Sequence, residues 1–153
     1  MSPENRGYAD NGDAFLKAAA AAHGAGRKVA LGDFRGRLVF LNFFATWCVP
    51  CREEMPPLNS LYTALKNEGF VVLGVSIDPS ETQVKSFVAE KNITYPVLMD
   101  SEKEVYFDLY AVLVLPTSFL IDKDGMIAEK ILGERDWNSA EMKEKIRTLL
   151  KKR

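Results

Sequence analysis

Two long apolar runs constrain the fold of this chain more than any other feature. Residues 38–44 (LVFLNFF) and 70–77 (FVVLGVSI) are almost continuously apolar and rich in β-branched and aromatic side chains. This composition is typical of strands that are buried on both faces of a sheet. Between them, leucines at helical spacing and the later Gly69 predict a helix from near Cys48 to about Asn67. A buried strand, a helix and a second buried strand indicate an α/β domain.

The rest of the chain continues this alternation of strands and helices. Strands are predicted at 27–31, at 95–100 and at 117–122, and the last pairs with 126–132 as a hairpin; helices are predicted at 81–91, 102–109 and 137–153. These elements predict one domain over residues 28–153, with a mixed central sheet and helices on both faces. Residues 1–27 are expected to form a loose tail and a short helix at 13–23, which contains an alanine run.

The bulk properties exclude several classes of protein. A chain of 153 residues with a formal charge of −1 suits one globular domain and gives no reason to expect nucleic acid or an anionic membrane as a partner. No apolar run approaches the ~20 residues of a membrane span. The first residues also lack the basic start and apolar core of a signal peptide. Two possibilities stay open: a cytosolic protein, or an exported domain whose targeting segment has been removed.

The only two cysteines, Cys48 and Cys51, lie in the segment CVPC. A structural zinc site needs four ligands, and His23 is the only histidine that could join them. A purely structural disulfide would close a loop of two residues, which removes little entropy from the unfolded chain. Both interpretations are therefore weaker than the third, a redox-active dithiol.

The position of the cysteine pair favours redox chemistry. Cys48 follows a predicted buried strand and opens a predicted helix, where free backbone N–H groups and the helix dipole stabilise a thiolate. A thiolate is the attacking species in thiol–disulfide exchange. Cys51, one turn later, would resolve the mixed disulfide, and Pro50 suits the first turn of the helix because its missing N–H costs nothing there.

Two segments of this sequence carry a family resemblance. NFFATWCVPCREEMP, residues 42–56, and VLVLPTSFLID, residues 112–122, resemble the thioredoxin superfamily, and within it the TlpA/ResA/CcmG group of thiol–disulfide oxidoreductases. Residues 75–100 are similar to the extra helix–strand insertion of this group, and the likeness extends over about 28–150. The group usually has an earlier strand, where this chain reads DAFLKAAAAAHGAG. Either a helix replaces that strand, or residues 15–16 begin a shorter version of it.

The resemblance implies roles for four catalytic residues. Cys48 would be the exposed nucleophile, Cys51 the buried resolving thiol, and Pro116 the residue after a cis peptide bond. Glu54 matches the acidic residue that the group places near its buried cysteine, and it would exchange a proton with Cys51. The alternative is that Glu54 is a solvated helix residue, as Glu53 is expected to be.

The resemblance also implies a groove that receives the substrate. Leu115 would offer backbone groups to an extended substrate segment, and Thr117 would help to hold the proline loop. Trp47 would either lie beside the reactive sulfur or cap the core. Val49 would be exposed and, with Pro50, would tune the reduction potential. Asn42 stands where ordinary thioredoxins carry a buried aspartate.

The function implied by the resemblance is that of a protein disulfide oxidoreductase. It would reduce specific partners outside the cytoplasm, such as apocytochrome c, and a membrane-embedded thiol donor would reduce it again. It would need no cofactor or metal, because the cysteines carry the electrons, and it would be a monomer, periplasmic or membrane-anchored. Two alternatives are a binding module whose cysteines are idle or sense redox state, and a peroxidase, for which Arg52 is thin support.

Overall fold

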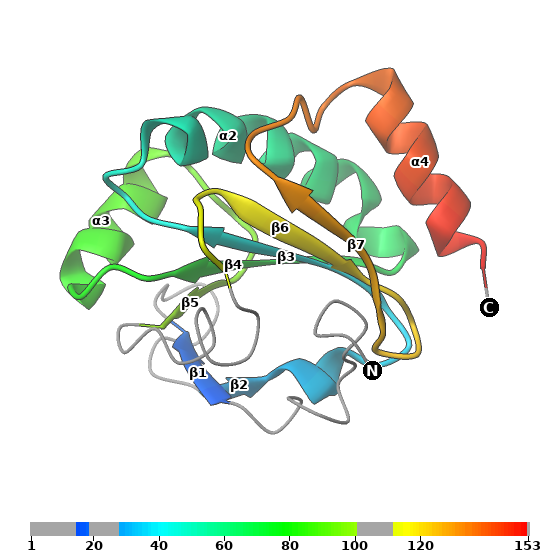
Figure 1. The fold of residues 1–153 in the computed structure, drawn as a ribbon, viewed down its shortest axis with the longest axis horizontal. Coiled ribbons are helices and arrows are strands. Elements are labelled where there is room, and N and C mark those ends of the chain that lie inside the picture. The colour runs from blue at the N-terminus through cyan, green and yellow to red at the C-terminus, as the bar shows by residue number, and fades with distance from the viewer. Residues whose placement is uncertain (1–14, 19–27, 101–111, 153) are drawn as a thin grey trace.

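The described part of the chain folds around a seven-stranded mixed sheet with the strand order β2-β1-β5-β4-β3-β6-β7 (Figure 1). The computed structural model describes residues 15–18, 28–100 and 112–152. The strands are β1 Phe15–Ala18, β2 Lys28–Ala30, β3 Leu38–Phe44, β4 Phe70–Ser76, β5 Val97–Met99, β6 Thr117–Ile121 and β7 Ile127–Leu132. The α-helices are α2 Val49–Leu65, α3 Glu81–Glu90 and α4 Ala140–Leu150, with short 3-10 helices η3 Leu31–Phe34 and η4 Lys66–Glu68.

The two apolar runs form the centre of the sheet, as predicted. Strand β3 lies between β4, which is parallel to it, and β6, which is antiparallel. Every residue of β3 and of β4 is buried. The predicted hairpin is also present, because β6 pairs with β7 in an antiparallel register.

The three described α-helices lie on one side of the sheet (Figure 1). From β3, Phe40 packs edge-on against Trp137 ahead of α4, and Phe44 stacks on Phe87 of α3. The helix predicted at 137–153 is shorter than expected, because Ser139 caps α4 by accepting the backbone N–H of Met142. The helix predicted at 102–109 lies outside the described residues.

The predicted helix at 13–23 is wrong where the structure describes it. Residues Phe15–Ala18 form β1, which pairs antiparallel with both β2 and β5. Alanine favours helices, but a short isolated helix is marginal in water, whereas two neighbouring strands provide partners for this backbone. The shorter version of the family's first strand is therefore the correct alternative, and it belongs to the same sheet as the strands after residue 28. The rest of this segment, including His23, lies outside the described residues.

The insertion implied by the resemblance is formed by α3 and β5. Strand β5 extends the sheet beyond β4 and pairs parallel to it. Close packing here depends on Gly74, because a Cβ atom at that position would lie 3.1 Å from Tyr95 Cε1 and 3.3 Å from Phe44 Cε1. The absence of a side chain lets these two rings approach the backbone of β4.

Candidate active site

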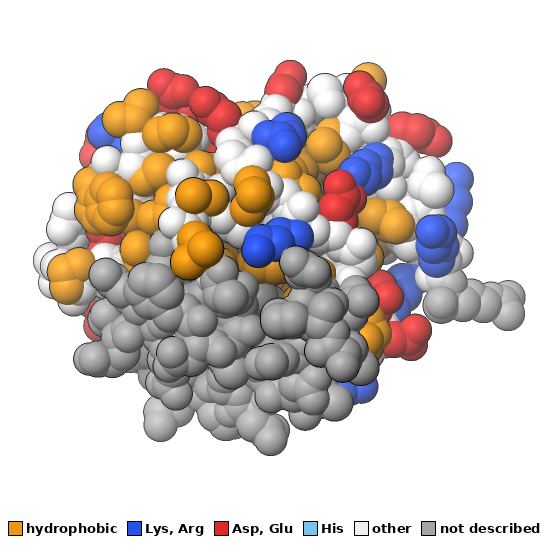
Figure 2. Space-filling view, viewed as in Figure 1, with side chains coloured by type: hydrophobic (Ala, Val, Ile, Leu, Met, Phe, Trp, Pro, Cys, Tyr) orange, Lys and Arg blue, Asp and Glu red, His pale blue; other side chains and the backbone are white. Residues whose placement is uncertain are grey.

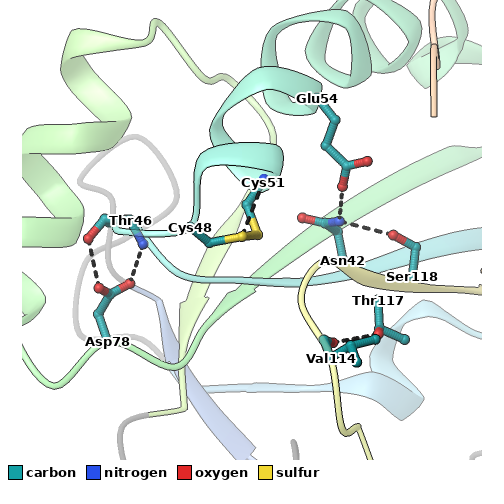
Figure 3. Close-up of a disulfide and its surroundings, with 9 residues drawn as sticks. All are labelled: Asn42, Thr46, Cys48, Cys51, Glu54, Asp78, Val114, Thr117 and Ser118. Atoms are coloured by element: carbon teal, nitrogen blue, oxygen red, sulfur yellow. Dashed lines mark hydrogen bonds between the residues drawn. A yellow bond between two sulfur atoms is a disulfide. The ribbon is translucent and has the colours of Figure 1, made fainter. Parts of the chain in front are cut away.

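Cys48 and Cys51 form a disulfide at the start of α2 (Figure 3). Cys48 is the N-cap residue of the helix, and its Sγ accepts the backbone N–H of Cys51 at 3.4 Å. Pro50 lies in the first turn, where no N–H is needed. The Cys48 sulfur therefore lies at the positive end of the helix dipole, which would stabilise a thiolate once the disulfide is reduced.

The two cysteines differ in accessibility, but less than the prediction of an exposed nucleophile implied. Cys48 is 8% exposed and Cys51 is completely buried. Cys48 is covered because, as the N-cap, it turns its sulfur back over the first turn of α2. In the disulfide form, then, a partner reaches only an edge of Cys48 and nothing of Cys51.

Glu54 lies one turn beyond Cys51 and is buried, whereas its neighbour Glu53 is exposed. Its Oε1 accepts the side-chain amide of Asn42 at 2.8 Å, and its Oε2 accepts the indole N–H of Trp137 at 2.9 Å. Burial removes the carboxyl group from water and raises its pKa from 4.5 to about 7, although these hydrogen bonds oppose the shift. The Glu54 carboxyl group can therefore gain or lose a proton near neutral pH.

The amide of Asn42 joins Glu54 to the opposite strand. Its Nδ2 donates both to Glu54 and, at 3.0 Å, to Ser118 Oγ (Figure 3). Asn42 and Ser118 are direct partners in the β3–β6 register. Ser118 and Trp137 were not predicted as site residues, since they lie 76 and 83 residues away from their partners in sequence.

A second buried carboxylate fixes the turn that carries the cysteines. Asp78, after β4, accepts the backbone N–H of Thr46 at 2.9 Å and its hydroxyl at 2.7 Å (Figure 3). Ser76 donates its hydroxyl to the same carboxylate at 2.6 Å. Asp78 is completely buried, and Thr46 is two residues before Cys48. Sequence reasoning missed this group, because the only local signal is an aspartate at the end of a buried strand.

The proline loop lies at the same end of the sheet. The Leu115–Pro116 peptide bond is cis, as the resemblance implied. Thr117 Oγ1 donates to the carbonyl of Val114 at 2.7 Å across this loop, and the carbonyl of Pro116 accepts the N–H of Gly133. Since Thr117 is in register with Phe43 near the end of β3, the loop adjoins the end of the strand that leads to Cys48.

Exposed apolar side chains surround these two loops. Figure 2 shows hydrophobic side chains gathered over the start of α2 and the segment that leads into β6. Trp47 is 65% exposed and therefore does not cap the core, while Leu115 is only partly exposed. The other members of this apolar rim are Val49, Leu113 and Val114.

The fold and its cysteine site match known proteins along most of the chain. The family model described as "AhpC/TSA family" matches residues 12–130. The chain belongs to the AhpC/TSA family.

Relatives of this family member carry names from thiol–disulfide chemistry. It is 46% identical over 110 residues to the thiol-disulfide oxidoreductase ResA of Bacillus cereus. The aligned segment covers 72% of this chain and 63% of the length of that relative. A proposed thiol:disulfide interchange protein DsbE from Chlorobium tepidum has a TM-score of 0.78 at 30% identity, covering 92% of this chain and 98% of the other. A secreted thiol-disulfide isomerase from Corynebacterium glutamicum has a TM-score of 0.76 at 26% identity, and the match covers 95% of this chain and 88% of the other. These neighbours confirm the thioredoxin-like fold.

Two further findings concern metals and membranes. Within residues 15–18, 28–100 and 112–152, no three His, Cys, Asp or Glu side chains come together as a metal site would require. In the same part of the chain, no helix has the length and apolar character needed to cross a bilayer.

Proposed function

We propose that this protein is a thiol–disulfide oxidoreductase that exchanges electrons with protein disulfides through Cys48 and Cys51. The observation that carries the proposal is the disulfide at the start of α2, with Cys48 at the helix N-terminus and Cys51 buried behind it. In the reduced protein, the Cys48 thiolate attacks one sulfur of a partner disulfide. A Cys48–partner disulfide forms, and the second partner sulfur leaves as a thiolate.

The second step completes the two-electron reduction of the partner. The Cys51 thiol loses its proton, its sulfur attacks Cys48 Sγ, and the remaining partner sulfur leaves as a thiolate. The Cys48–Cys51 disulfide is then formed, and the partner is a dithiol. Glu54 is the proposed acceptor of the Cys51 proton, because its pKa of about 7 lets it act as a base near neutral pH.

We place Pro116 and the apolar rim in the binding of the partner. Leu115 offers backbone groups beside Pro116, and Thr117 holds this loop through Val114. The exposed Trp47 and Val49 provide apolar surface at the edge of Cys48. An unfolded or extended protein segment fits this surface better than a small polar thiol does.

The partners and compartment follow from the same proposal. The protein reduces specific partners outside the cytoplasm, such as apocytochrome c, and receives electrons from a membrane thiol donor. It acts as a monomer, either periplasmic or anchored to the membrane. The name of one solved neighbour, a secreted thiol-disulfide isomerase, supports a place outside the cytoplasm, and that of a relative, a thiol-disulfide oxidoreductase, supports exchange with disulfides.

Trapping the mixed disulfide tests the order of attack. The Cys51→Ala variant should accumulate a stable adduct through Cys48 with a disulfide-bonded partner such as insulin. The matched Cys48→Ala variant should form none, because the buried Cys51 cannot be reached. Adducts that form only through Cys51 would reverse the assignment.

Assays of the wild-type protein with insulin, oxidised glutathione and hydrogen peroxide distinguish the alternative functions. A binding module with idle cysteines would reduce neither insulin nor oxidised glutathione. A peroxidase would consume hydrogen peroxide quickly and leave insulin disulfides intact. Transfer of electrons from the reduced wild-type protein to insulin is the result expected from the proposed function.

A further inference from the structure

The side chain of Asn42 has one polar atom that the structure leaves without a partner. Both of its amide hydrogens are engaged, by Glu54 Oε1 at 2.8 Å and by Ser118 Oγ at 3.0 Å. When Glu54 is ionised, these bonds fix the orientation of the amide, because a carboxylate only accepts hydrogen bonds and cannot face the carbonyl end. The Oδ1 atom therefore points away from Glu54 and Ser118.

Asn42 Oδ1 is a buried acceptor that receives no hydrogen bond from any described residue. Asn42 is completely buried, and no donor among the described residues lies within hydrogen-bonding distance of this oxygen. An unpaired acceptor inside a protein is costly, and native proteins retain few of them. Figure 3 shows Oδ1 on the side of the amide that faces the Cys48–Cys51 disulfide.

The disulfide lies on this side of Asn42, and its hydrogen-bonding capacity changes during the reaction. A sulfur in a disulfide has no hydrogen, whereas a thiol is a donor, although a weak one. Cys51 is completely buried, so its thiol needs an acceptor inside the protein rather than in water. Asn42 Oδ1 is an acceptor without a described donor, and the thiol of reduced Cys51 is a donor that needs an acceptor.

We propose that Asn42 Oδ1 accepts the S–H of Cys51 whenever the cysteine pair is reduced, so that this amide favours the dithiol over the disulfide. The inference rests on the proposed function, since it needs the pair to cycle. Reduction by a partner dithiol transfers two electrons and two protons. The partner becomes a disulfide, Cys48 and Cys51 become free, and the proton on Cys51 Sγ makes the new hydrogen bond.

The arrangement also links the thiol to Glu54 through one side chain. The bonds S–H to Oδ1 and Nδ2–H to Oε1 form a chain in which each bond polarises the next. Asn42 itself gains or loses no proton. The residue therefore positions the Cys51 proton, while Glu54 remains the proposed acid–base group.

A redox equilibrium measures this hydrogen bond directly. Asn42→Leu loses the bonds to Glu54 and Ser118 in both redox states, but it loses the bond to Cys51 only in the reduced state. The measurement keeps Glu54 and is made at pH 8, above its pKa of about 7, because a glutamine at this position could donate to Oδ1 and turn the amide over. We expect the equilibrium with glutathione to move about tenfold toward the protein disulfide, which corresponds to about 30 mV.

Ser118→Ala at the same pH is the matched control. It removes a bond to the same amide in both redox states, so the equilibrium should stay within about twofold of that of the wild-type protein. An Asn42→Leu equilibrium equal to that of the wild-type protein would overturn the inference and leave the proposed function intact. A wild-type protein that does not exchange with glutathione at all would instead contradict the proposed function.

A second measurement needs no substitution in the core. In wild-type protein with ¹³C-labelled asparagine, the side-chain carbonyl resonance of Asn42 should move when the disulfide is reduced. Asn59 is the internal reference, because its Oδ1 already accepts from the N–H and the hydroxyl of Thr94. A change at Asn42 no larger than that at Asn59 would overturn the inference, even if Asn42→Leu fails to fold.

Discussion

At the scale of single residues, burial changes what Glu54 can do. The carboxyl group is 1% exposed, and its hydrogen bonds to Asn42 and Trp137 only partly compensate for the loss of water. Its exposed neighbour Glu53 differs by one position on the same helix. Two adjacent glutamates therefore belong to two chemical classes, one a surface charge and the other a buried acid.

The stability of the fold should depend on pH through Glu54. Its pKa is 4.5 in the unfolded chain and about 7 in the fold, so between these values the folded state holds a proton that the unfolded state has lost. Stability should therefore fall as the pH rises through this window, by up to about 3 kcal/mol, and level off above it. Urea unfolding of the oxidised protein at pH 5 and pH 8 measures the difference.

Glu54→Gln should remove most of this pH dependence, and Glu53→Gln should leave it unchanged. The two substitutions make the same chemical change one residue apart. If the wild-type protein gains stability between pH 5 and pH 8, the sign of the Glu54 shift is wrong.

Tyr95 presents the opposite case, a buried polar group without a use in the site. Its ring is completely buried, and its hydroxyl has no hydrogen-bond partner among the described residues. Tyr95→Phe should therefore stabilise the fold by about 1 kcal/mol, because it removes an unpaired polar atom. Tyr62→Phe is the control, since Tyr62 packs edge-on against Tyr95 but is only partly buried. Thermal unfolding of both variants checks this, and a clear loss of stability in Tyr95→Phe would contradict it.

At the scale of elements, the turn between β3 and α2 is held by a residue that follows the neighbouring strand β4. Asp78 lies after β4, yet its carboxylate binds both the N–H and the hydroxyl of Thr46. The parallel pairing of β3 and β4 brings these two strand ends together. The position of Cys48 thus depends on the register of two strands as well as on its own helix.

Asp78→Ala should weaken both the fold and the chemistry. It leaves three buried donors on Thr46 and Ser76 without their acceptor, which should cost about 3 kcal/mol in urea unfolding. The rate at which reduced Cys48 attacks a small disulfide should fall about tenfold, because the turn no longer holds the nucleophile in place. Asp124→Ala, in the exposed turn before β7, should change neither quantity. Equal rates for the two variants would exclude Asp78 as a positioning residue.

The sequence predicted a strand or helix correctly where the pattern of its own residues indicates how the element is buried. Strands β3 and β4 are buried on both faces, and an apolar run is the direct sequence signature of that burial. Strand β1 has no such signature, because it leads into an alanine run that favours a helix, and only its neighbours β2 and β5 make it a strand. Hydrogen bonds between strands are not encoded in the pattern of one segment.

At the scale of the whole molecule, a local sequence pattern predicts the cysteine pair and Glu54 but not the distant residues that hold Glu54 in place. The cysteine pair and Glu54 lie within one turn or two of a single helix, so a local motif contains all three. Trp137 and Ser118 reach this helix only through the β3–β6 pairing and the segment before α4. Their roles depend on the complete fold, which no short stretch of sequence specifies.

Trp47 should contribute to partner binding but little to the stability of the fold. Trp47 is 65% exposed beside a buried core, so Trp47→Ala should change the free energy of unfolding by less than about 0.5 kcal/mol. The same variant should reduce insulin about tenfold more slowly, because an exposed aromatic side chain at the rim is lost to the partner. The reaction with oxidised glutathione serves as the control and should stay within about twofold. An equal slowing with both substrates would indicate that Trp47 acts on Cys48 itself.

The placement of the two tryptophans gives the protein two optical probes with separate reach. Trp137 is buried and donates its indole N–H to Glu54, so its emission should follow the ionisation of that carboxyl group. Trp47 is exposed and adjacent to Cys48, so its emission should follow solvent and an arriving partner. A fluorescence titration of Trp47→Phe should therefore show a transition near pH 7, while Trp137→Phe should lose it. Proton movement and partner contact can thus be timed independently in one molecule without any added label.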